Sequence, residues 1–403
     1  MKKTQQTLDR YREVMVPNYA PMAVVPESGQ GVWLTDVEGK KYLDMGGGIA
    51  VTGLGHSHPK IIAALKAQAD KLWHVSNYYA STPAIELAEL LTSLTGFDRV
   101  FFCNSGSEAV EASLKIARRY AFDQFGPEKN QIISFHKSFH GRSLFTVTAG
   151  GQESNRKGFG PLPAQMTYGH YNDIEDITSL VNKNTCAIIM EPVMAEGGVY
   201  PADLEFVQAV RALADKHQVS LIFDEVQSGI GRTGTLFCYE QFGIRPDIVA
   251  SAKSLGSGFP IGAMLTTDKI AQTFQPGTHG STFGGNLLGC AVAKATIEEI
   301  SKPETLGNVV IRGEQLTVGL NKLNQTYNLF SVVRGNGLLV GAELTGPFKG
   351  KAKEFVAEGL NQGLMMLVAG PNVLRFAPAL IITESEINQA LSLLELTAKK
   401  IIG

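Results

Sequence analysis

Short apolar runs alternate with amphipathic stretches through the middle of the chain. Each run is too brief for a helix, so we expect a series of buried strands. These runs are residues 99–103, 131–135, 186–190, 221–223 and 248–252. A long helix with Val110, Leu114 and Ala117 on one face is expected after the first run. Alternating strands and helices are typical of α/β proteins with a mostly parallel central sheet.

The two ends of the chain have a different character. Residues 1–58 are expected to form an arm with a hairpin, and this arm packs with the C-terminal part. From residue 302 the elements become shorter and more mixed, with strand candidates at 332–343 and 373–378. A length of 403 residues suggests more than one domain. We therefore predict three parts, which are an N-terminal arm (1–58), a large domain (59–301) and a small α+β domain (302–403).

Two charged residues follow neighbouring predicted strands, Asp224 after the fourth run and Lys253 after the fifth. The carboxyl ends of parallel strands meet at one edge of a sheet, where ligands bind. Taken alone, either residue could be a helix cap, half of a salt bridge or a solvated charge. However, Lys253 lies between an apolar strand and a glycine-rich loop, where an unpaired ammonium costs several kcal/mol. The pair suits pyridoxal phosphate, which a lysine holds as a Schiff base while an aspartate pairs with the ring nitrogen.

A Gly/Ser-rich turn, NSGSE, joins the first predicted strand to the long helix. Free backbone N–H groups and the helix dipole make such a turn an anion site, and Ser105 and Ser107 add hydroxyl groups. A plain helix cap has the same sequence pattern, so the turn alone leaves both interpretations open. The later glycine-rich loop at 278–286 contains Ser281 and Thr282, which offer a second phosphate contact.

Further polar residues follow the other predicted strands. Phe139 and Arg142 lie in the loop FHGR, where an aromatic ring can stack on a flat ligand and an arginine can bind a carboxylate. Glu191 and Glu196 follow the run at 186–190. Arg375 is a charge within an apolar strand. A surface arginine at 142 and an ordinary ion pair at 375 remain open as alternatives.

The composition excludes several classes of function. A net charge of -2 gives no electrostatic reason to expect nucleic acid, and no long apolar segment predicts a membrane span. The four cysteines are far apart and show no metal-binding spacing, so we expect reduced core residues of a cytoplasmic protein without a metal site. The basic start of the chain lacks the apolar stretch of a secretory signal. Walker A, GxSxG and HExxH motifs are absent.

Seven segments, taken with their order and spacing, resemble the class III (ω-amino acid) aminotransferases of fold type I. They are GIAVTGLGHSHP, NSGSEAVEASLKIAR, SFHGRSLFTVTAGG, MEPVMAEGGV, LIFDEVQSGIGRTG, SAKSLGSGFPIGA and HGSTFGGN. The similarity covers nearly the full length. Within the family, LWHVSN, FHGR and NVLRFAPAL are most similar to the acetylornithine and succinylornithine aminotransferases. Met194, Ala195 and Ser257 depart from the usual family residues, which leaves the acyl-ornithine preference open.

The resemblance implies a cofactor, pyridoxal 5'-phosphate, and a role for each residue around it. Lys253 would hold the cofactor and move the proton, and Asp224 would pair with the pyridine nitrogen. Gln227 would contact the ring oxygen, and Phe139 would stack on the ring. The implied cofactor-binding set is Ser105, Gly106, Ser107, Phe139, Glu191, Asp224, Gln227, Lys253 and Thr282, the last from the partner subunit of a homodimer.

The resemblance also implies two carboxylate-binding arginines. Arg142, with Ser281 nearby, would take the α-carboxylate of the ornithine derivative. Arg375 would take the α-carboxylate of glutamate or 2-oxoglutarate. Glu196 would act as a gate that pairs with Arg375 and swings away when glutamate binds.

The implied reaction moves the δ-amino group of N2-acetylornithine or N2-succinylornithine to 2-oxoglutarate, which gives the semialdehyde and glutamate in arginine metabolism. Ornithine or 4-aminobutyrate transamination is the alternative within the class, because those relatives share the FHGR arginine. A pyridoxal-phosphate-dependent aminomutase and a non-catalytic ligand-binding protein are the alternatives from other classes.

Overall fold

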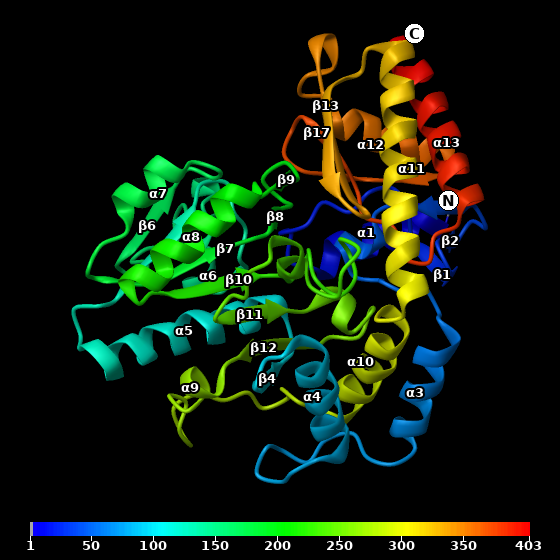
Figure 1. Ribbon diagram of the computed structural model, residues 1–403. Coiled ribbons are helices and arrows are strands. Elements are labelled where there is room, and N and C mark those ends of the chain that lie inside the picture. The colour runs from blue at the N-terminus through cyan, green and yellow to red at the C-terminus, as the bar shows by residue number, and fades with distance from the viewer. Residues whose placement is uncertain (1–2) are drawn as a thin grey trace.

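A computed structural model describes residues 3–403, and a seven-stranded sheet lies at its centre (Figure 1). In spatial order its strands are β4 (Arg99–Cys103), β12 (Gly262–Thr266), β11 (Ile248–Ser251), β10 (Ser220–Asp224), β7 (Thr185–Met190), β5 (Gln131–Phe135) and β6 (Met166–Gly169). Strand β12 is antiparallel to both of its neighbours, and all other pairings are parallel, so the remaining six strands share one direction. The predicted mostly parallel sheet is confirmed.

Helices cover both faces of this sheet, which explains why its strands are continuous apolar runs rather than alternating ones. Along β7, Ile189 belongs to the core beneath α5 (Gly106–Phe125). Its neighbour Ile188 belongs to the opposite core, together with Val207 of α8 (Leu204–His217). The five predicted strands are confirmed to within one residue at each end, and the long helix predicted after the first of them is α5.

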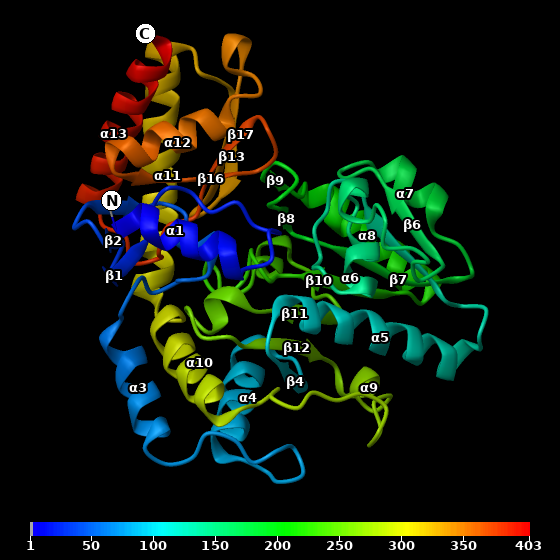
Figure 2. The same ribbon diagram turned by 180° about the vertical axis from the view of Figure 1, so that it is seen from behind.

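The remaining elements lie between the strands of the central sheet, in the N-terminal arm or in the C-terminal part (Figure 2). The helices are α1 (Lys3–Val14), α2 (Gly47–Ala50), α3 (Pro59–Ala69), α4 (Thr82–Thr95), α6 (Leu144–Ala149), α7 (Ile174–Leu180), α9 (Asp268–Ala271) and α10 (Leu287–Ile300). The 3-10 turns are η1 (Glu153–Asn155), η2 (Cys238–Phe242), η3 (Lys253–Leu255) and η4 (Gly346–Phe348). A two-stranded ribbon is formed by β8 (Val193–Met194) and β9 (Tyr200–Pro201).

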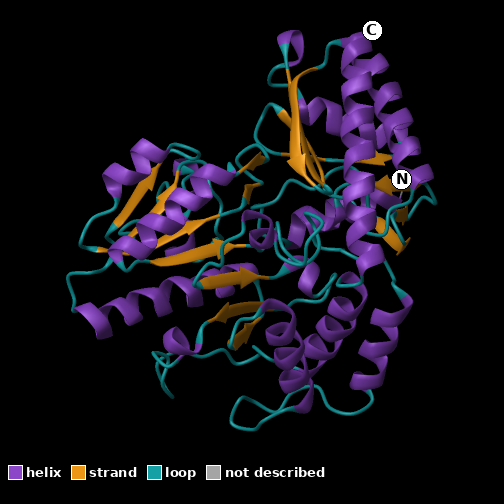
Figure 3. Cartoon of the chain, viewed as in Figure 1, coloured by secondary structure: helices purple, strands orange, loops and turns teal. Residues whose placement is uncertain are grey.

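The C-terminal part forms its own antiparallel sheet beside three helices (Figure 3). The strands, in order, are β13 (Phe330–Asn336), β14 (Leu339–Leu344), β17 (Val373–Phe376) and β16 (Leu367–Val368). The helices are α11 (Pro303–Tyr327), α12 (Ala352–Gln362) and α13 (Glu384–Ile402). The strand predicted at 332–343 is wrong in one respect, because it is a hairpin that turns at Gly337, whose φ is +54°. A left-handed backbone at glycine allows this tight turn.

The N-terminal hairpin is joined to the C-terminal part by strand pairing. Strands β1 (Pro26–Gln30), β2 (Trp33–Asp36) and β3 (Lys41–Asp44) form a sheet with β15 (Leu364–Met365), which pairs with β3 in parallel. The division into 1–58, 59–301 and 302–403 stays a prediction.

Within residues 3–403, no helix combines the length and the apolar character needed to cross a bilayer.

Candidate active site

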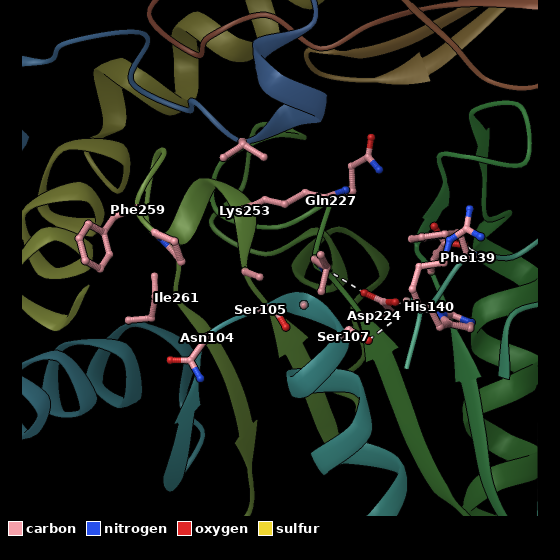
Figure 4. A pocket seen from close by; sticks show the side chains of 18 of the residues that line it. Asn104, Ser105, Ser107, Phe139, His140, Asp224, Gln227, Lys253, Phe259 and Ile261 are labelled. Carbon is pink, nitrogen blue, oxygen red and sulfur yellow. Dashed lines mark hydrogen bonds and ion pairs between the residues drawn. The ribbon is translucent and has the colours of Figure 1, made fainter. Parts of the chain in front are cut away.

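The site lies where the strands of the central sheet end, because the loops that follow β4, β5, β7, β10 and β11 converge there (Figure 4). Together they enclose a cavity of about 430 Å³. Its wall includes residues 104–107, 139–142, Glu191, Asp224, Gln227 and Lys253. Sequence reasoning did not single out Val51, Val226, Phe259 or Ile261, which supply apolar wall. These four carry no polar group whose position would have marked them.

Lys253 begins η3 directly after β11 and is held in an unusual conformation. Its φ is +47°, in the left-handed region that non-glycine residues rarely adopt. Such strain is found at functional sites, where the surrounding structure enforces it. Burial lowers the pKa of the Lys253 amine to about 8, and the Arg375 cation acts in the same direction, although nearby carboxylates oppose it. The amine is therefore far closer to its neutral, nucleophilic form than an exposed lysine.

Asp224 ends β10 and is paired with a residue that the sequence did not single out, His140. The distance between His140 Nδ1 and Asp224 Oδ2 is 2.7 Å, and the imidazole is fully buried. Burial disfavours the imidazolium, but the hydrogen bond and charge of Asp224 overcome this and raise the pKa of His140. The other carboxylate oxygen, Oδ1, accepts from Val226 N at 3.1 Å. The only sequence signal for His140 was its place beside Phe139.

Glu191 follows β7, and its carboxylate binds the backbone of two functional loops. Oε2 accepts from Phe139 N at 3.0 Å and Oε1 accepts from Ala195 N at 3.4 Å. The pKa of Glu191 is raised to about 7, chiefly by burial; the charge of His140 lowers it and the charge of Asp224 raises it. Glu191 therefore connects the loop that presents Phe139 to the segment that leads into Glu196.

The turn after β4 has the features of both interpretations that the sequence left open. Ser105 caps α5, because its hydroxyl oxygen accepts from Glu108 N at 3.2 Å. The N–H groups of Gly106 and Ser107 lie in the first helical turn, where no intrahelical acceptor exists, and they border the cavity. A Cβ atom at Gly106 would lie 2.6 Å from Val226 Cγ1, so only glycine fits there. The turn is a capped helix start that also offers an anion site.

Phe139 and Arg142 form the wall of the cavity that follows β5. The Arg142 guanidinium carbon lies 5.5 Å from the centre of the Phe139 ring. The Arg142 side chain is exposed, so solvent and ligands reach it. This arrangement provides a flat face and a cation side by side.

Arg375, on β17, is buried and already paired with an acid. Its Nη1 lies 2.5 Å from Glu196 Oε1 and 3.0 Å from Gln227 Oε1. Burial alone would raise the pKa of Glu196, but the charge and hydrogen bond of Arg375 hold it below its ordinary value. Arg375 Nε has no partner in the part of the chain that the structure describes. The predicted Arg375–Glu196 pair is present, and Gln227 connects it to the cavity.

Ser281 and Thr282 lie outside the cavity wall of this chain. Ser281 Oγ accepts from Asn104 Nδ2, which borders the cavity, at 3.1 Å. Thr282 lies beside a separate small crevice with His74 and Asn77. The structure therefore brings the predicted residues together with the exceptions of Ser281 and Thr282.

The residues present fit pyridoxal phosphate. The cavity wall includes free helix N-terminal N–H groups that suit a phosphate, and the ring of Phe139 and apolar Val226, which suit a flat ring. It also includes an amine with a lowered pKa and a carboxylate paired with a buried histidine. A covalent bond to the cofactor would also account for the buried lysine, whose charge is costly to enclose.

The chain is similar to known proteins over almost its whole length. It is 52% identical over 385 residues to the acetylornithine aminotransferase of Vibrio vulnificus, and the match covers 96% of each chain. It is 49% identical over 393 residues to the succinylornithine transaminase of Photorhabdus laumondii, and that match covers 98% of each chain.

The fold of the chain is also similar to those of solved aminotransferase structures. An N-acetylornithine aminotransferase from Stenotrophomonas maltophilia superposes with a TM-score of 0.86 at 39% identity, covering 98% of this chain and 99% of that one. Residues 14–397 match the aminotransferase class-III family. The resemblance drawn from the seven segments is confirmed, and the chain belongs to the class-III aminotransferases.

Proposed function

We propose that the protein transfers the δ-amino group of N2-acetylornithine, or of its succinyl analogue, to 2-oxoglutarate in arginine metabolism. One observation carries this proposal: a single cavity is lined by an exposed arginine, Arg142, and by Gln227, which binds a second, buried arginine, Arg375. Relatives named for these activities are about half identical to the chain, which supports the substrate class. Ornithine and 4-aminobutyrate transamination and an aminomutase are not favoured by these relatives.

The residues of the wall would each hold one part of pyridoxal phosphate. The N–H groups of Gly106 and Ser107 would bind its phosphate, Phe139 would cover one face of its ring, and Gln227 would contact its ring oxygen. Asp224 would pair with the ring nitrogen and keep it protonated, with His140 fixing the carboxylate from behind. When bound, the cofactor supplies an electron sink that stabilises negative charge on the substrate carbon.

Lys253 would perform the proton transfers. Its amine would hold the cofactor covalently and, once free, would serve as the base and acid of the reaction. A lysine with a pKa of about 8 forms its neutral amine far more readily than an exposed lysine, and the neutral amine can accept a proton from the substrate carbon. The same amine can then donate that proton to the cofactor carbon on the other side of the transferred nitrogen. Burial keeps water from competing for it.

In the first half-reaction the donor presents its distal amine to Lys253 and its α-carboxylate to Arg142. This end of the donor carries no carboxylate, so Arg375 has no substrate partner and stays paired with Glu196. An unpaired buried guanidinium would cost several kcal/mol. The ion pair therefore keeps the pocket suitable for an ω-amine.

In the second half-reaction the acceptor presents a carboxylate next to the reacting carbon. Glu196 would swing away, and Arg375 would bind this carboxylate instead. The unpartnered Nε of Arg375 provides a further donor for the second carboxylate oxygen. The second carboxylate of glutamate or 2-oxoglutarate remains free to reach Arg142.

The proposal includes a homodimer, with Thr282 bound to the phosphate held by the neighbouring subunit. Exposed aromatic residues near the Thr282 loop support a partner surface, because large exposed apolar patches mark interfaces. Tyr78 is 94% exposed, Trp73 63% and Phe283 60%. We also propose that the protein is cytoplasmic, as its unpaired buried cysteines favour.

A half-reaction followed by absorbance tests the function. We expect N2-acetylornithine without acceptor to bleach the yellow cofactor band, and 2-oxoglutarate to restore it. Parallel rates with succinylornithine, ornithine and 4-aminobutyrate rank the donors. A yellow protein that none of them bleaches would refute the substrate proposal. A protein that cannot be reconstituted with the cofactor would refute the site as well.

A further inference from the structure

Arg232 is a fully buried cation that the proposed reaction does not use. It lies between β10 and η2, and its side chain is among the largest that are wholly enclosed. Burial lowers its pKa to about 9. Its Nε and Nη2 atoms find no hydrogen-bond partner in the part of the chain that the structure describes. Enclosing such a cation costs several kcal/mol, so its position requires a compensating role.

The one guanidinium nitrogen that is engaged binds the C-terminal sheet at two points. Arg232 Nη1 donates to Leu338 O at 3.1 Å and to Pro378 O at 2.5 Å. Arg232 O also accepts from Leu338 N at 3.0 Å. Residue 232 therefore binds the C-terminal sheet through its side chain and through its backbone.

These contact points lie at the end of the sheet that carries Arg375. Leu338 directly precedes β14, and Pro378 lies two residues after the end of β17. The two strands are paired antiparallel, with Gly341 opposite Arg375 and Val340 opposite Phe376. Leu338 and Pro378 are thus close to each other across the ladder, and Arg232 holds both strands at once.

Further contacts anchor the same corner. Ala377 N donates to Met45 O and Leu380 N donates to Gly53 O, each at 2.7 Å. Arg142, in contrast, lies on a loop after β5, where its backbone N–H donates to Ser107 Oγ at 3.3 Å. A change at Arg232 is therefore expected to move one carboxylate-binding arginine and leave the other in place.

We infer that Arg232 is a positioning residue: by holding the carbonyl groups of Leu338 and Pro378, it sets the position of Arg375 relative to Gln227, which lines the active-site cavity. Its effect falls mainly on the dicarboxylate half-reaction. The inference rests on the proposed function only through the assignment of dicarboxylates to Arg375.

The test compares the two half-reactions in Arg232→Met, Arg232→Lys and the unaltered holoenzyme. We expect Arg232→Met to lower kcat/KM for glutamate at least about tenfold, because a displaced Arg375 would lose one charge-assisted hydrogen bond to the substrate carboxylate. The value of kcat/KM for N2-acetylornithine should change about threefold or less. Lysine can still donate to one carbonyl group, so Arg232→Lys should recover part of the loss. Glutarate, which binds without reacting, should shift the cofactor spectrum at higher concentration in both variants.

A matched control separates positioning from stability. Arg211 is another mostly buried arginine, but its partner Asp247 precedes β11 and so lies at the amino end of that strand in the central sheet, whereas the active-site loops follow the carboxyl ends. Arg211→Met should lower the thermal midpoint without changing the ratio of the two half-reactions.

If Arg232→Met lowers both half-reactions by the same factor, or lowers neither, the ratio of the two is unchanged and the inference is overturned. If Arg232→Met does not fold, glutarate binding to Arg232→Lys is the test. Weaker binding than to the unaltered enzyme supports the inference, and equal binding overturns it. Failure of the unaltered enzyme to use N2-acetylornithine would refute the proposed function alone, because glutamate and glutarate still report on Arg232.

Discussion

The two arginines of the site differ in almost every physical respect. Arg142 is exposed, lies on a loop of the large sheet and has its guanidinium beside an aromatic ring. Arg375 lies within a strand of the C-terminal sheet, is 3% exposed and is paired with Glu196. In the proposed reaction, Arg142 is open to any carboxylate, while Arg375 must exchange the carboxylate of Glu196 for that of a substrate.

The difference explains how one cavity can accept donors with different ends. A permanent open cation near the reacting amine would attract dicarboxylates and leave an ω-amine facing an unpaired charge. Covering it with Glu196 makes the resting pocket neutral at that position. The energy of the ion pair is largely recovered when a substrate carboxylate replaces Glu196, because both partners are carboxylates of similar geometry.

Lys253→Ala is expected to have the largest effect, because it should abolish both half-reactions. Its loss of activity is the reference for the variants that separate the two half-reactions. Lys253→Ala deletes the amine in the cavity wall that can transfer the proton. General acid–base catalysis contributes up to about 10⁴-fold, so we expect a loss of roughly that size with either substrate. Single-turnover absorbance measures it. A Lys253→Ala variant with full activity would show that the lysine has no catalytic role.

Arg375→Ala should separate the two half-reactions most strongly. Removing one member of a buried charge pair costs about 2–5 kcal/mol, so we expect kcat/KM for glutamate to fall about 10²–10³-fold. The N2-acetylornithine half-reaction should lose much less, since its reacting end does not use Arg375. Similar losses with the two substrates would contradict the division of roles.

Arg142→Ala should weaken both half-reactions, unlike Arg375→Ala. The donor loses its carboxylate partner, and glutamate loses the partner of its second carboxylate. Because the site is exposed, each interaction contributes less, and we expect losses of about 10–10²-fold in kcat/KM. Arg142→Lys retains the charge but not the two parallel N–H donors of a guanidinium, so its kcat/KM should lie between those of Arg142→Ala and the unaltered enzyme. An unaffected donor would show that the carboxylate binds elsewhere.

Glu196→Gln should remove the carboxylate that competes with substrate for Arg375. Arg375 would then be available to any carboxylate, as Arg142 is. The amide keeps a hydrogen bond to Arg375 but not the charge, so dicarboxylates should compete better. We expect the ratio of glutamate to N2-acetylornithine rates to rise about threefold to tenfold. Competition between the two substrates in one reaction measures this ratio directly. If it is unchanged, Glu196 is not a gate.

The smallest effect is a shift in the titration of Lys253. Its pKa is lowered to about 8 chiefly by burial; Glu196 raises it and Arg375 lowers it. Only the neutral amine reacts with an aldehyde, so capture of pyridoxal phosphate by the cofactor-free protein should speed up with rising pH and level off above about pH 8. In Glu196→Gln the midpoint should move to lower pH. A midpoint near that of an exposed lysine would contradict the buried site.

Much of the fold was predictable because its physical cause is local. Strands buried on both faces, such as β7 and β10, must be continuous apolar runs, and their boundaries follow from where the runs end. Residues such as Asp224 and Lys253 stand out because a charge directly after such a run is unexpected. The hairpin of β13 and β14 was read as one strand, since its turn contains apolar Leu338 beside a single left-handed glycine.

The unpredicted part of the site depends on contacts between distant segments. His140 and Asp224 are 84 positions apart, and Arg232 and Pro378 are 146 apart. Sequence periodicity carries no information on such pairs, because it describes only neighbours on one element. Arg375 and Glu196 were paired in advance through family resemblance and charge logic. Ser281 and Thr282 were assigned by resemblance alone, Thr282 to the partner subunit of the proposed homodimer, and both lie outside the cavity wall of this chain.

The left-handed backbone and buried amine of Lys253 have a consequence for the evolution of this protein. Both features oppose folding, and a glycine at position 253 would relieve the strain and remove the enclosed amine together. Selection for thermal robustness alone would therefore favour the loss of this lysine. Its retention in the chain is a mark of selection for chemistry, in the manner of a stability–activity trade-off.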